Sequence, residues 1–405
     1  MRGAAVLLVA LLACVEQKGP VRSGAQSIHL NITAPQSLGT RDQPLQSRNV
    51  TFDVDLIGPD GKVVPVDRDL ELYTWFLGTL GRNLGPAPSD LSRCRGVLPA
   101  PIHVTQGSAK NISVTLPLAY GPVNLWLEDC HDPGASWAVG ASDPLWFPYP
   151  TIQNVQQPLD LATFDYRIFA DSPLENKQVQ IDTSPGGQMV VTSVFAQFYT
   201  VTDTGLSSFS SLDVYSFSKP RVQVGDVIVG QSLTGAISEF VGMTELNFPL
   251  QRIDVAHSPA PLPPPVQMTI ADFNYGADAA KAARLESLEA SVVELRDGCV
   301  CPADSSYDQF QEWKLAFKTT TGNYNCGRNY SMTMSTAGVV VGWDPPQAGR
   351  HVQVARGVLV NLAGLASKTS GNPFSFFVLH PRNSSTLPAG TPPDLVDAGD
   401  TCTPM

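Results

Sequence analysis

The chain has 405 residues, of which only 16% are charged, against about 25% in an average soluble protein. Its formal net charge is −11, which disfavours unspecific binding to nucleic acid or to anionic membrane surfaces, because both repel a negative protein. The 33 glycines and 34 prolines are typical of a chain with many turns between strands and disfavour a helical fold.

The first residues have the pattern of a secretory leader. One early positive charge precedes the apolar stretch Ala4 to Ala13, which is shorter than the about 20 residues that a membrane-spanning helix needs. Cys14 follows Leu11-Leu12-Ala13, and this pattern resembles the lipobox of bacterial lipoproteins. The resemblance implies that residues 1–13 are a signal peptide, that Cys14 carries the lipid, and that Val15 in place of aspartate directs the protein to the outer membrane. The alternative is an ordinary leader with an incidental cysteine.

The cysteines predict disulfides, because an even number remains when Cys14 is set aside in a chain that enters an oxidising compartment. We expect Cys94 to pair with Cys130, since no other cysteine lies in that half of the mature chain. Cys299 and Cys301 are too close to bridge comfortably to each other, so they should take different partners. The remaining candidates are Cys326 and Cys402. Structural zinc is disfavoured, because Cys-x2-Cys pairs and suitably spaced histidines are missing, and we expect no metal.

After a polar, lipidated tether at residues 14–27, apolar and polar residues alternate as in strands with one buried face. Gly58 to Lys62 supplies a turn. The predicted strands include Ile28–Ile32, Val50–Leu56, Leu70–Leu77, Ile112–Leu116, Val123–Cys130 and Trp137–Gly140. Short strands at close spacing, with a cysteine and nearby tryptophans, resemble an immunoglobulin-like sandwich over residues 28–150. The resemblance is architectural only, and the antibody disulfide is not carried over.

A linker at residues 151–176 leads to a second β block at residues 177–256. Its motifs resemble the OB-fold domains attached to secreted bacterial nucleases, and the resemblance implies a small β-barrel. Gly225-Asp226 would make the tight turn that starts a barrel strand, and Gly235 would allow the bend at a barrel corner. The resemblance rests on three segments: Phe198–Asp203, Val222–Gly230 and Glu239–Leu246.

The proline-rich stretch 257–266 predicts a stiff spacer. Alanines from Ala277 to Ala283 then favour one helix, and apolar residues recur at three- and four-residue steps up to a stop at Gly298. These apolar residues are Leu285, Leu288, Val292 and Leu295.

Later strands resemble a second OB barrel over residues 267–385. They are Trp313–Phe317, Tyr330–Met334, Val352–Leu359 and Phe376–Arg382. The pattern stops at Arg382, so residues 386–405 are predicted to be a polar tail pinned by Cys402. The predicted fold class is therefore all-β: an Ig-like sandwich followed by two OB-like barrels, with one helix before or within the second.

The sequence offers little catalytic chemistry. The nucleases with such OB domains have a separate catalytic domain, of which no trace is found here, and Gly-x-Ser-x-Gly and His-Glu-x-x-His are absent. The group Glu128-Asp129-Cys130-His131-Asp132 could supply a Cys–His nucleophile or a metal site, but a disulfide in a polar turn is favoured. We therefore predict no catalytic residue and no cofactor.

Ligand binding remains, because OB barrels bind oligonucleotides or oligosaccharides on a strand face. Between Asp165 and Asp254 there are ten Asp or Glu and five Lys or Arg residues, unlike the basic groove of single-strand binders. We expect a non-catalytic binding, adhesion or scaffold module with a protein or polysaccharide ligand. The alternative is a nucleic-acid-binding protein or an accessory subunit of an extracellular nuclease. The candidate ligand face is Phe195, Phe198, Tyr199, Tyr215 and Phe217.

Overall fold

The computed structural model forms two compact units, of which the first runs to Phe147 and the second from Pro148. Strands dominate both units, so the predicted all-β class is confirmed. The described residues are 26–34, 48–70, 102–116, 120–127, 137–138, 140–158, 171–240, 242–272, 279–336, 339–340, 342–343, 346–361 and 377–405.

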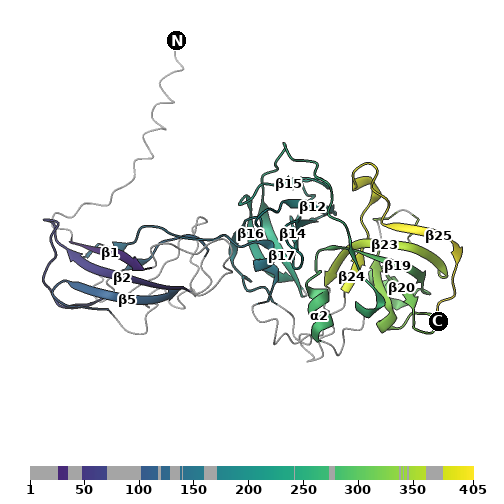
Figure 1. The fold of residues 1–405 in the computed structure, drawn as a ribbon, viewed down its shortest axis with the longest axis horizontal. Helices are drawn as coiled ribbons and strands as arrows, with labels where there is room; N and C mark the ends of the chain where they lie inside the picture. Colours follow the sequence, from purple (N-terminus) through teal and green to yellow (C-terminus); the bar gives the residue numbers. More distant parts are fainter. Residues whose placement is uncertain are drawn as a thin grey trace, which may run out of the picture. The chain divides into compact units, whose positions relative to one another are not determined.

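The first unit contains a four-stranded sheet in the order β5-β2-β1-β8, in which β2 pairs antiparallel with both β1 and β5 (Figure 1). Alternate residues of β2, from Val50 to Leu56, are fully buried, as the alternation predicted. The strands of the first unit are β1 (Gln26–Ala34), β2 (Arg48–Ile57), β3 (Arg68–Leu70), β4 (Ile102–Val104), β5 (Ser108–Leu116), β6 (Gly121–Val123), β7 (Trp126–Leu127), β8 (Trp137–Ala138), β9 (Gly140–Ala141) and β10 (Leu145–Phe147).

The predicted turn after β2 is also present. The amide of Gly58 donates to the carbonyl oxygen of Lys62 at 2.8 Å, and Gly61 has a φ of 74°, a conformation that glycine adopts without steric cost.

The second unit begins with a curled seven-stranded sheet in the order β11-β16-β17-β14-β13-β12-β15. Only β14 and β17 run parallel in it. The sheet follows the short helix α1 (Ile152–Gln156), whose N-cap Thr151 accepts the amide of Asn154. Its strands are β11 (Gln178–Ile181), β12 (Met189–Val194), β13 (Phe198–Asp203), β14 (Ser211–Tyr215), β15 (Val227–Ile228), β16 (Leu233–Phe240) and β17 (Met243–Leu250). We call this sheet the first barrel.

The second barrel repeats most of these pairings, except that β23 pairs with β19, whereas β16 of the first barrel pairs with β11 and not with β12. β19 pairs with β20, β20 with β22, β22 runs parallel to β24, β24 pairs with β23, and β23 returns to β19. Its elements are β18 (Val266–Gln267), η1 (Ile270–Asp272), α2 (Ala279–Glu286), β19 (Val292–Val300), α3 (Ser305–Phe310), β20 (Glu312–Lys318), β21 (Tyr324–Asn325), η2 (Arg328–Tyr330), β22 (Ser331–Ser335), β23 (Arg350–Asn361), β24 (Phe377–His380), η3 (Ser384–Thr386) and β25 (Leu395–Thr401).

The predicted long helix is wrong in its second half. Helix α2 ends at Glu286, and Val292 and Leu295 lie instead on strand β19, where the β-branched pair Val292-Val293 favours a strand. Gly298 does not end a helix but lies inside β19, where a Cβ atom would approach the side chain of Leu315 to 2.6 Å. Short helical and strand patterns share apolar spacings, which explains the error.

Two further expectations are wrong. The strand pattern does not stop at Arg382, because β25 pairs antiparallel with β23, although Cys402 does hold this end through a disulfide. The proline-rich stretch was predicted to be a stiff spacer, but it packs on the first barrel. The amide of Ala260 donates to the carbonyl oxygen of Gly225 at 2.8 Å, and Ala260 packs with Val190 and Val227 of the first barrel.

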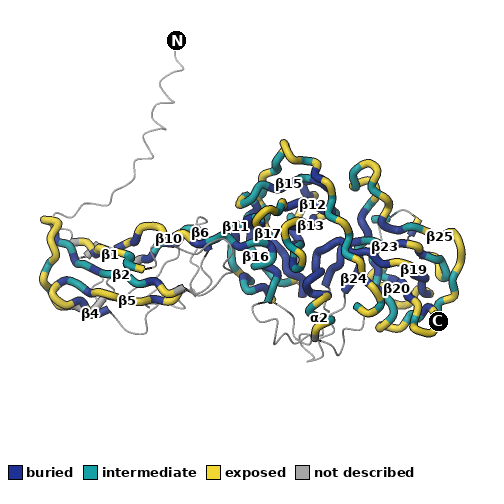
Figure 2. The backbone as a smooth tube through the Cα atoms, in the orientation of Figure 1, coloured by how far each residue is buried: buried dark blue, intermediate teal, exposed yellow. Residues whose placement is uncertain are grey.

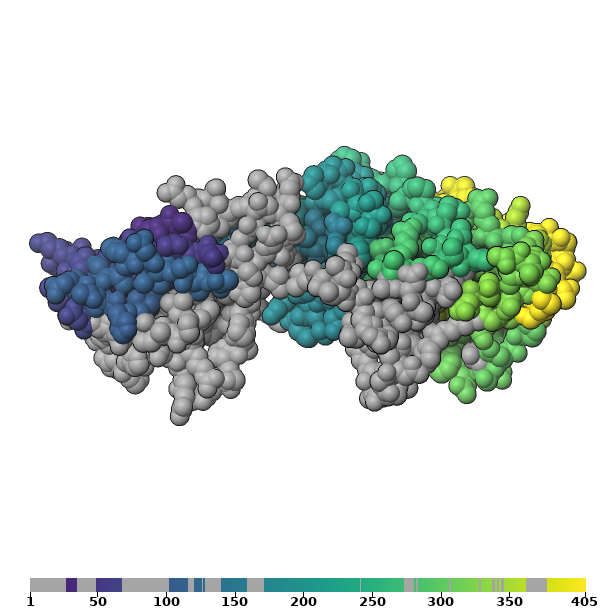
Figure 3. Space-filling model, turned by 60° about the horizontal axis from the view of Figure 1, so that its bottom comes forward, coloured from purple at the N-terminus to yellow at the C-terminus, as the bar shows by residue number. Residues whose placement is uncertain are grey.

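The two barrels contact each other through a junction that is both apolar and polar. Met243 of β17 packs against Val292, Val358 and Val360 of the second barrel. Figure 2 shows buried residues in both barrels and where they meet, and Figure 3 shows the atoms of the two barrels adjoining each other. Hydrogen bonds of 2.9 to 3.1 Å also cross the junction, among them Thr244 N to Glu289 Oε1, Arg382 Nη1 to Thr192 O, and Ser291 Oγ to Ser211 Oγ.

Candidate functional site

The structure divides the five predicted ligand-face residues into two groups. Tyr199 is fully buried, so its assignment to a ligand face is wrong: it points to the inner side of β13 and belongs to the core. Phe195 and Phe198 stack on each other with ring centroids 4.4 Å apart. Phe195 also packs against the apolar part of the junction and meets the ring of His380 edge-on at 6.3 Å. These residues therefore serve the core and the junction.

Tyr215 and Phe217 form an outward-facing cluster with a third ring, Phe248. The rings of Phe217 and Phe248 stack at 4.7 Å with 21° between their planes, and Tyr215 meets Phe217 edge-on at 4.6 Å. Phe217 is 51% exposed and Phe248 is 68% exposed. Such rings usually lie in a core, because each buries a large apolar area. We call these three residues the aromatic stack.

The backbone beneath the aromatic stack is strained. Phe217 has a φ of 57° and Phe248 a φ of 54°, values that are outliers for bulky side chains. Each such residue costs on the order of 1 to 3 kcal/mol, and strained residues of this kind cluster at functional sites. Two strained residues that meet each other in solvent are poorly explained by core packing, so we treat the aromatic stack as the candidate site.

A β-bulge places Phe248 in this position. The register between β16 and β17 shifts between Thr234 and Ala236, where Phe248 is part of the extra length on β17. Gly235 lies opposite, and a Cβ atom there would approach the carbonyl oxygen of Asn247 to 2.6 Å. The bend expected at Gly235 is thus present, and it turns Phe248 outward.

Phe248 is not among the five predicted ligand-face residues. The available signal was an apolar pair, Phe248 and Leu250, on either side of Pro249. Proline lacks the N–H that a strand ladder needs, so it marks an edge or a bulge. Both apolar side chains are exposed in the structure.

Polar groups line the aromatic stack on one side. The hydroxyl of Tyr215 donates to Oε1 of Gln197 at 3.3 Å, which orients the amide of this exposed side chain. The hydroxyl of Ser216 donates to the carbonyl oxygen of Gln197 at 2.9 Å. These contacts fix the loop between β12 and β13 beside the rings.

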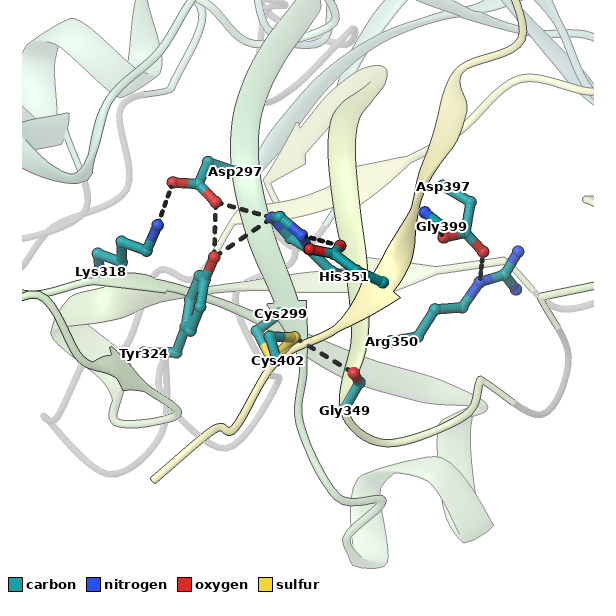
Figure 4. A network of polar contacts seen from close by, with 11 residues as sticks. Asp297, Cys299, Lys318, Tyr324, Gly349, Arg350, His351, Asp397, Gly399 and Cys402 are labelled. Atoms are coloured by element: carbon teal, nitrogen blue, oxygen red, sulfur yellow. Dashed lines mark hydrogen bonds and ion pairs between the residues drawn. A yellow bond between two sulfur atoms is a disulfide. The ribbon is translucent and has the colours of Figure 1, made fainter.

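A second polar cluster lies around His351 on the second barrel (Figure 4). Asp297 Oδ1 accepts the hydroxyl of Tyr324 at 2.6 Å and lies 2.8 Å from His351 Nε2, while Asp297 Oδ2 lies 2.8 Å from Lys318 Nζ. The other ring nitrogen of His351, Nδ1, lies 2.5 Å from Asp400 Oδ1. Both ring nitrogens are thus engaged by carboxylates.

The pKa shifts in this cluster follow from its contacts. Partial burial by itself would raise the pKa of Asp297, but the hydrogen bonds from Lys318, Tyr324 and His351 outweigh it and lower the pKa to about 2. Burial by itself would lower the pKa of His351, but the hydrogen bonds to Asp400 and Asp297 raise it. A histidine held between two carboxylates is a poor general base, and here it ties β25 to β19 and β23.

Two disulfides reinforce the same region. Cys299 is bonded to Cys402, and Cys301 to Cys326. The prediction that Cys299 and Cys301 take different partners is confirmed. Cys14, Cys94 and Cys130 lie outside the described residues, as does the group from Glu128 to Asp132.

Buried carboxyl groups gather at the junction of the barrels. Glu289 accepts the amide of Thr244 through Oε1 at 2.9 Å, and Oε1 of Glu239 accepts the hydroxyl of the same threonine at 2.8 Å. Burial, with a smaller contribution from neighbouring carboxyls, raises the pKa of Glu239 to about 7 and that of Glu286 to about 8. Burial also places the pKa of Glu289 well above its usual range. In the part of the chain that the structure describes, no group of three or more His, Cys, Asp or Glu residues is arranged to hold a metal ion.

The chain matches no protein-family model, and neither a curated protein nor a solved structure is significantly similar to it. Among the described residues, no helix is both long and apolar enough to cross a membrane.

Proposed function

We propose that this protein is a non-catalytic binding or adhesion protein of the bacterial cell envelope, which a lipid on Cys14 would hold at the outer membrane. The observation that carries the binding role is the aromatic stack: three outward-facing rings, two of them on strained backbone. Exposed aromatic residues are enriched where proteins recognise ligands, because they bury a large area at little cost in conformational entropy.

The OB-like assignment of both barrels is part of the proposal. It is supported by a series of pairings that the two barrels share: two antiparallel pairs lead to a parallel pair, β14 with β17 and β22 with β24, and then to an antiparallel pair. A five-stranded Greek-key barrel with ligand-binding strands and loops is the OB architecture. The Ig-like assignment of the first unit rests on the sequence pattern alone.

A non-catalytic role fits the other polar clusters. Both nitrogens of His351 are occupied, and the carboxyls at the junction are shielded from solvent. The His351 cluster joins strands of the second barrel, and the carboxyl groups at the junction join the two barrels. Hydrolysis of DNA by the purified chain, abolished by a chelator, would contradict this part of the proposal.

The test combines anchoring with binding. Cells that express the wild-type chain should incorporate labelled fatty acid into it, and Cys14→Ala should abolish the label. Envelope polysaccharide extracted from the same bacterium should be retained by the immobilised full-length chain and lost in a Phe217→Ala/Phe248→Ala variant. Phe310→Ala is the matched control, because Phe310 is an exposed phenylalanine on the other barrel (66% exposed). Equal labelling in both chains would overturn the anchor, and no retention by the wild type would overturn the binding role.

A further inference from the structure

The two segments that carry the aromatic stack are locally basic in an otherwise acidic chain. Lys219 and Arg221 follow Phe217 by two and four residues, and Arg252 follows Phe248 by four. Four residues of extended chain span at most about 14 Å, so each cation is anchored within that distance of a ring-bearing residue. All three cations are exposed, and no described residue forms an ion pair with any of them.

The nearest carboxylates along the chain are engaged elsewhere. Asp226 accepts the amide of Gln223 at 2.7 Å, and Asp254 lies 2.7 Å from Nδ1 of His257. The other two acids on these strands, Asp213 and Glu245, are buried beneath the sheet surface. The two segments that carry the aromatic stack therefore bear exposed cations without ion-pair partners among the described residues, and this positive charge is opposite in sign to the net charge of the chain, −11.

We propose that the aromatic stack with Lys219, Arg221 and Arg252 binds an acidic polysaccharide, an inference that rests on the binding role proposed above. The outer face of Phe248 offers an apolar surface for the apolar face of a sugar ring. The amide of Gln197 and the nearby serine hydroxyls suit sugar hydroxyls. The three cations complement carboxylates spaced along such a chain.

A single-stranded nucleic acid fits these residues less well. Its backbone carries one charge per nucleotide, and binders of this class follow it with a continuous basic groove and several free aromatic faces. Here Phe217 and Phe248 stack on each other, so each ring has lost one face to the other. Only three cations lie on the segments of the aromatic stack, and the stretch from Asp165 to Asp254 has twice as many acidic as basic residues.

The experiment measures binding of the full-length chain to three probes: polygalacturonate, which is acidic; dextran, which is neutral; and oligothymidylate. We expect binding to polygalacturonate that weakens with added salt, because exposed charges are screened. Phe248→Ala should weaken it about tenfold, the usual loss for a central aromatic contact. The triple variant Lys219→Gln/Arg221→Gln/Arg252→Gln should weaken it similarly and remove the salt dependence. Phe310→Ala and Lys314→Gln, which alter an exposed ring and an exposed cation on the other barrel, should bind like the wild type.

The other outcomes distinguish the acidic-polysaccharide ligand from the general binding role proposed above. Equal binding to dextran and polygalacturonate, lost in Phe248→Ala, would overturn the acidic ligand and leave the binding role intact. Preference for oligothymidylate would overturn the polysaccharide in favour of nucleic acid. No binding to any probe would overturn the inference, while retention of envelope polysaccharide in the earlier test would still support the binding role. Unchanged circular dichroism of the variants excludes unfolding as the cause of any loss.

Discussion

Arg382 joins three segments of the second unit through one guanidinium group. Nη2 donates to Asp394 Oδ1 at 2.8 Å, Nε donates to Asp394 Oδ2 at 2.9 Å, and Nη1 donates to the carbonyl oxygen of Thr192 in the first barrel at 3.0 Å. Arg382 is 4% exposed and Asp394 is 1% exposed. A buried charge of this kind is tolerated only while its partner is present.

Arg382→Ala should therefore lower the free energy of unfolding by about 3 to 5 kcal/mol, because it leaves the Asp394 carboxylate buried without a partner. Lys314→Ala is the control. It removes an exposed pair with Asp304 at 2.7 Å, and it should cost at most about 1 kcal/mol. Urea unfolding of both variants measures the difference. Equal, small losses would show that the buried pair contributes little to the junction.

Backbone strain at Phe217 and Phe248, like a buried charge, persists only where another interaction offsets it. Neither residue gains the burial that usually offsets a left-handed conformation, because both rings face solvent. If the strain serves binding, Phe248→Gly should weaken binding without lowering the thermal midpoint, because glycine adopts this φ freely. A marked fall of the midpoint would mean that the ring stabilises the fold instead.

At the scale of elements, β25 is held at its end by a covalent bond. The Cys299–Cys402 disulfide closes a loop with a sequence separation of 103, whereas Cys301–Cys326 spans 25. The ring of His351 adds a second link near the same place by bridging Asp297 and Asp400. Strand β25 thus belongs to the barrel, although it carries mostly exposed polar residues.

Loss of the Cys299–Cys402 disulfide should lower the free energy of unfolding more than loss of Cys301–Cys326, because it increases the conformational entropy of the unfolded chain more. Loop-closure entropy predicts about 5 kcal/mol for Cys299→Ser/Cys402→Ser and about 3.5 kcal/mol for Cys301→Ser/Cys326→Ser. Unfolding free energies of the two double variants, measured in parallel, test the order. The reverse order would show that native packing around Cys326 outweighs the entropy of loop closure.

At the scale of the whole molecule, buried carboxyl groups lie at the junction of the two barrels, where burial favours their uncharged form. The carboxyl of Glu239 raises the pKa of Glu286 and Glu289, and Glu286 also raises that of Glu289. Asp171 and Glu175 raise the pKa of Glu239 in the same way. Asp213 at the same junction has no hydrogen-bond partner for either carboxyl oxygen among the described residues, and burial raises its pKa well above the usual range.

These shifts predict that the junction weakens as the pH rises. Below the usual carboxyl pKa of 4.5, both the folded and the unfolded chain keep their protons, so these groups do not affect stability. Between 4.5 and about 8, the unfolded chain releases protons that the folded chain retains, so the free energy of unfolding falls. Above about 8 Glu286 ionises in the folded chain too, and its contribution to the loss levels off.

Glu286→Gln should flatten this pH dependence and stabilise the protein at neutral pH, because the amide is neutral in both states. At a pH below 4.5 the variant and the wild type should be equally stable, which serves as the internal control. Thermal unfolding across the pH range measures the effect. A wild-type stability that is constant between the two limits would contradict the raised pKa values.

The sequence by itself determined the local features of this protein. Alternation in β2, the turn at Gly58, most strands of both barrels and the separate partners of Cys299 and Cys301 all follow from periodicity, turn chemistry and chain geometry over a few residues. These rules are local, so they need no knowledge of distant contacts.

The tertiary structure decided what depends on distant partners. Leu295 became part of a strand because β23 lies beside it, and Tyr199 became core because its side of β13 faces inward. The aromatic stack joins Phe217 to Phe248 across a parallel strand pair, and the junction brings Glu289 to Thr244. No local pattern encodes such pairs, because the contact is formed only when the barrels close and meet.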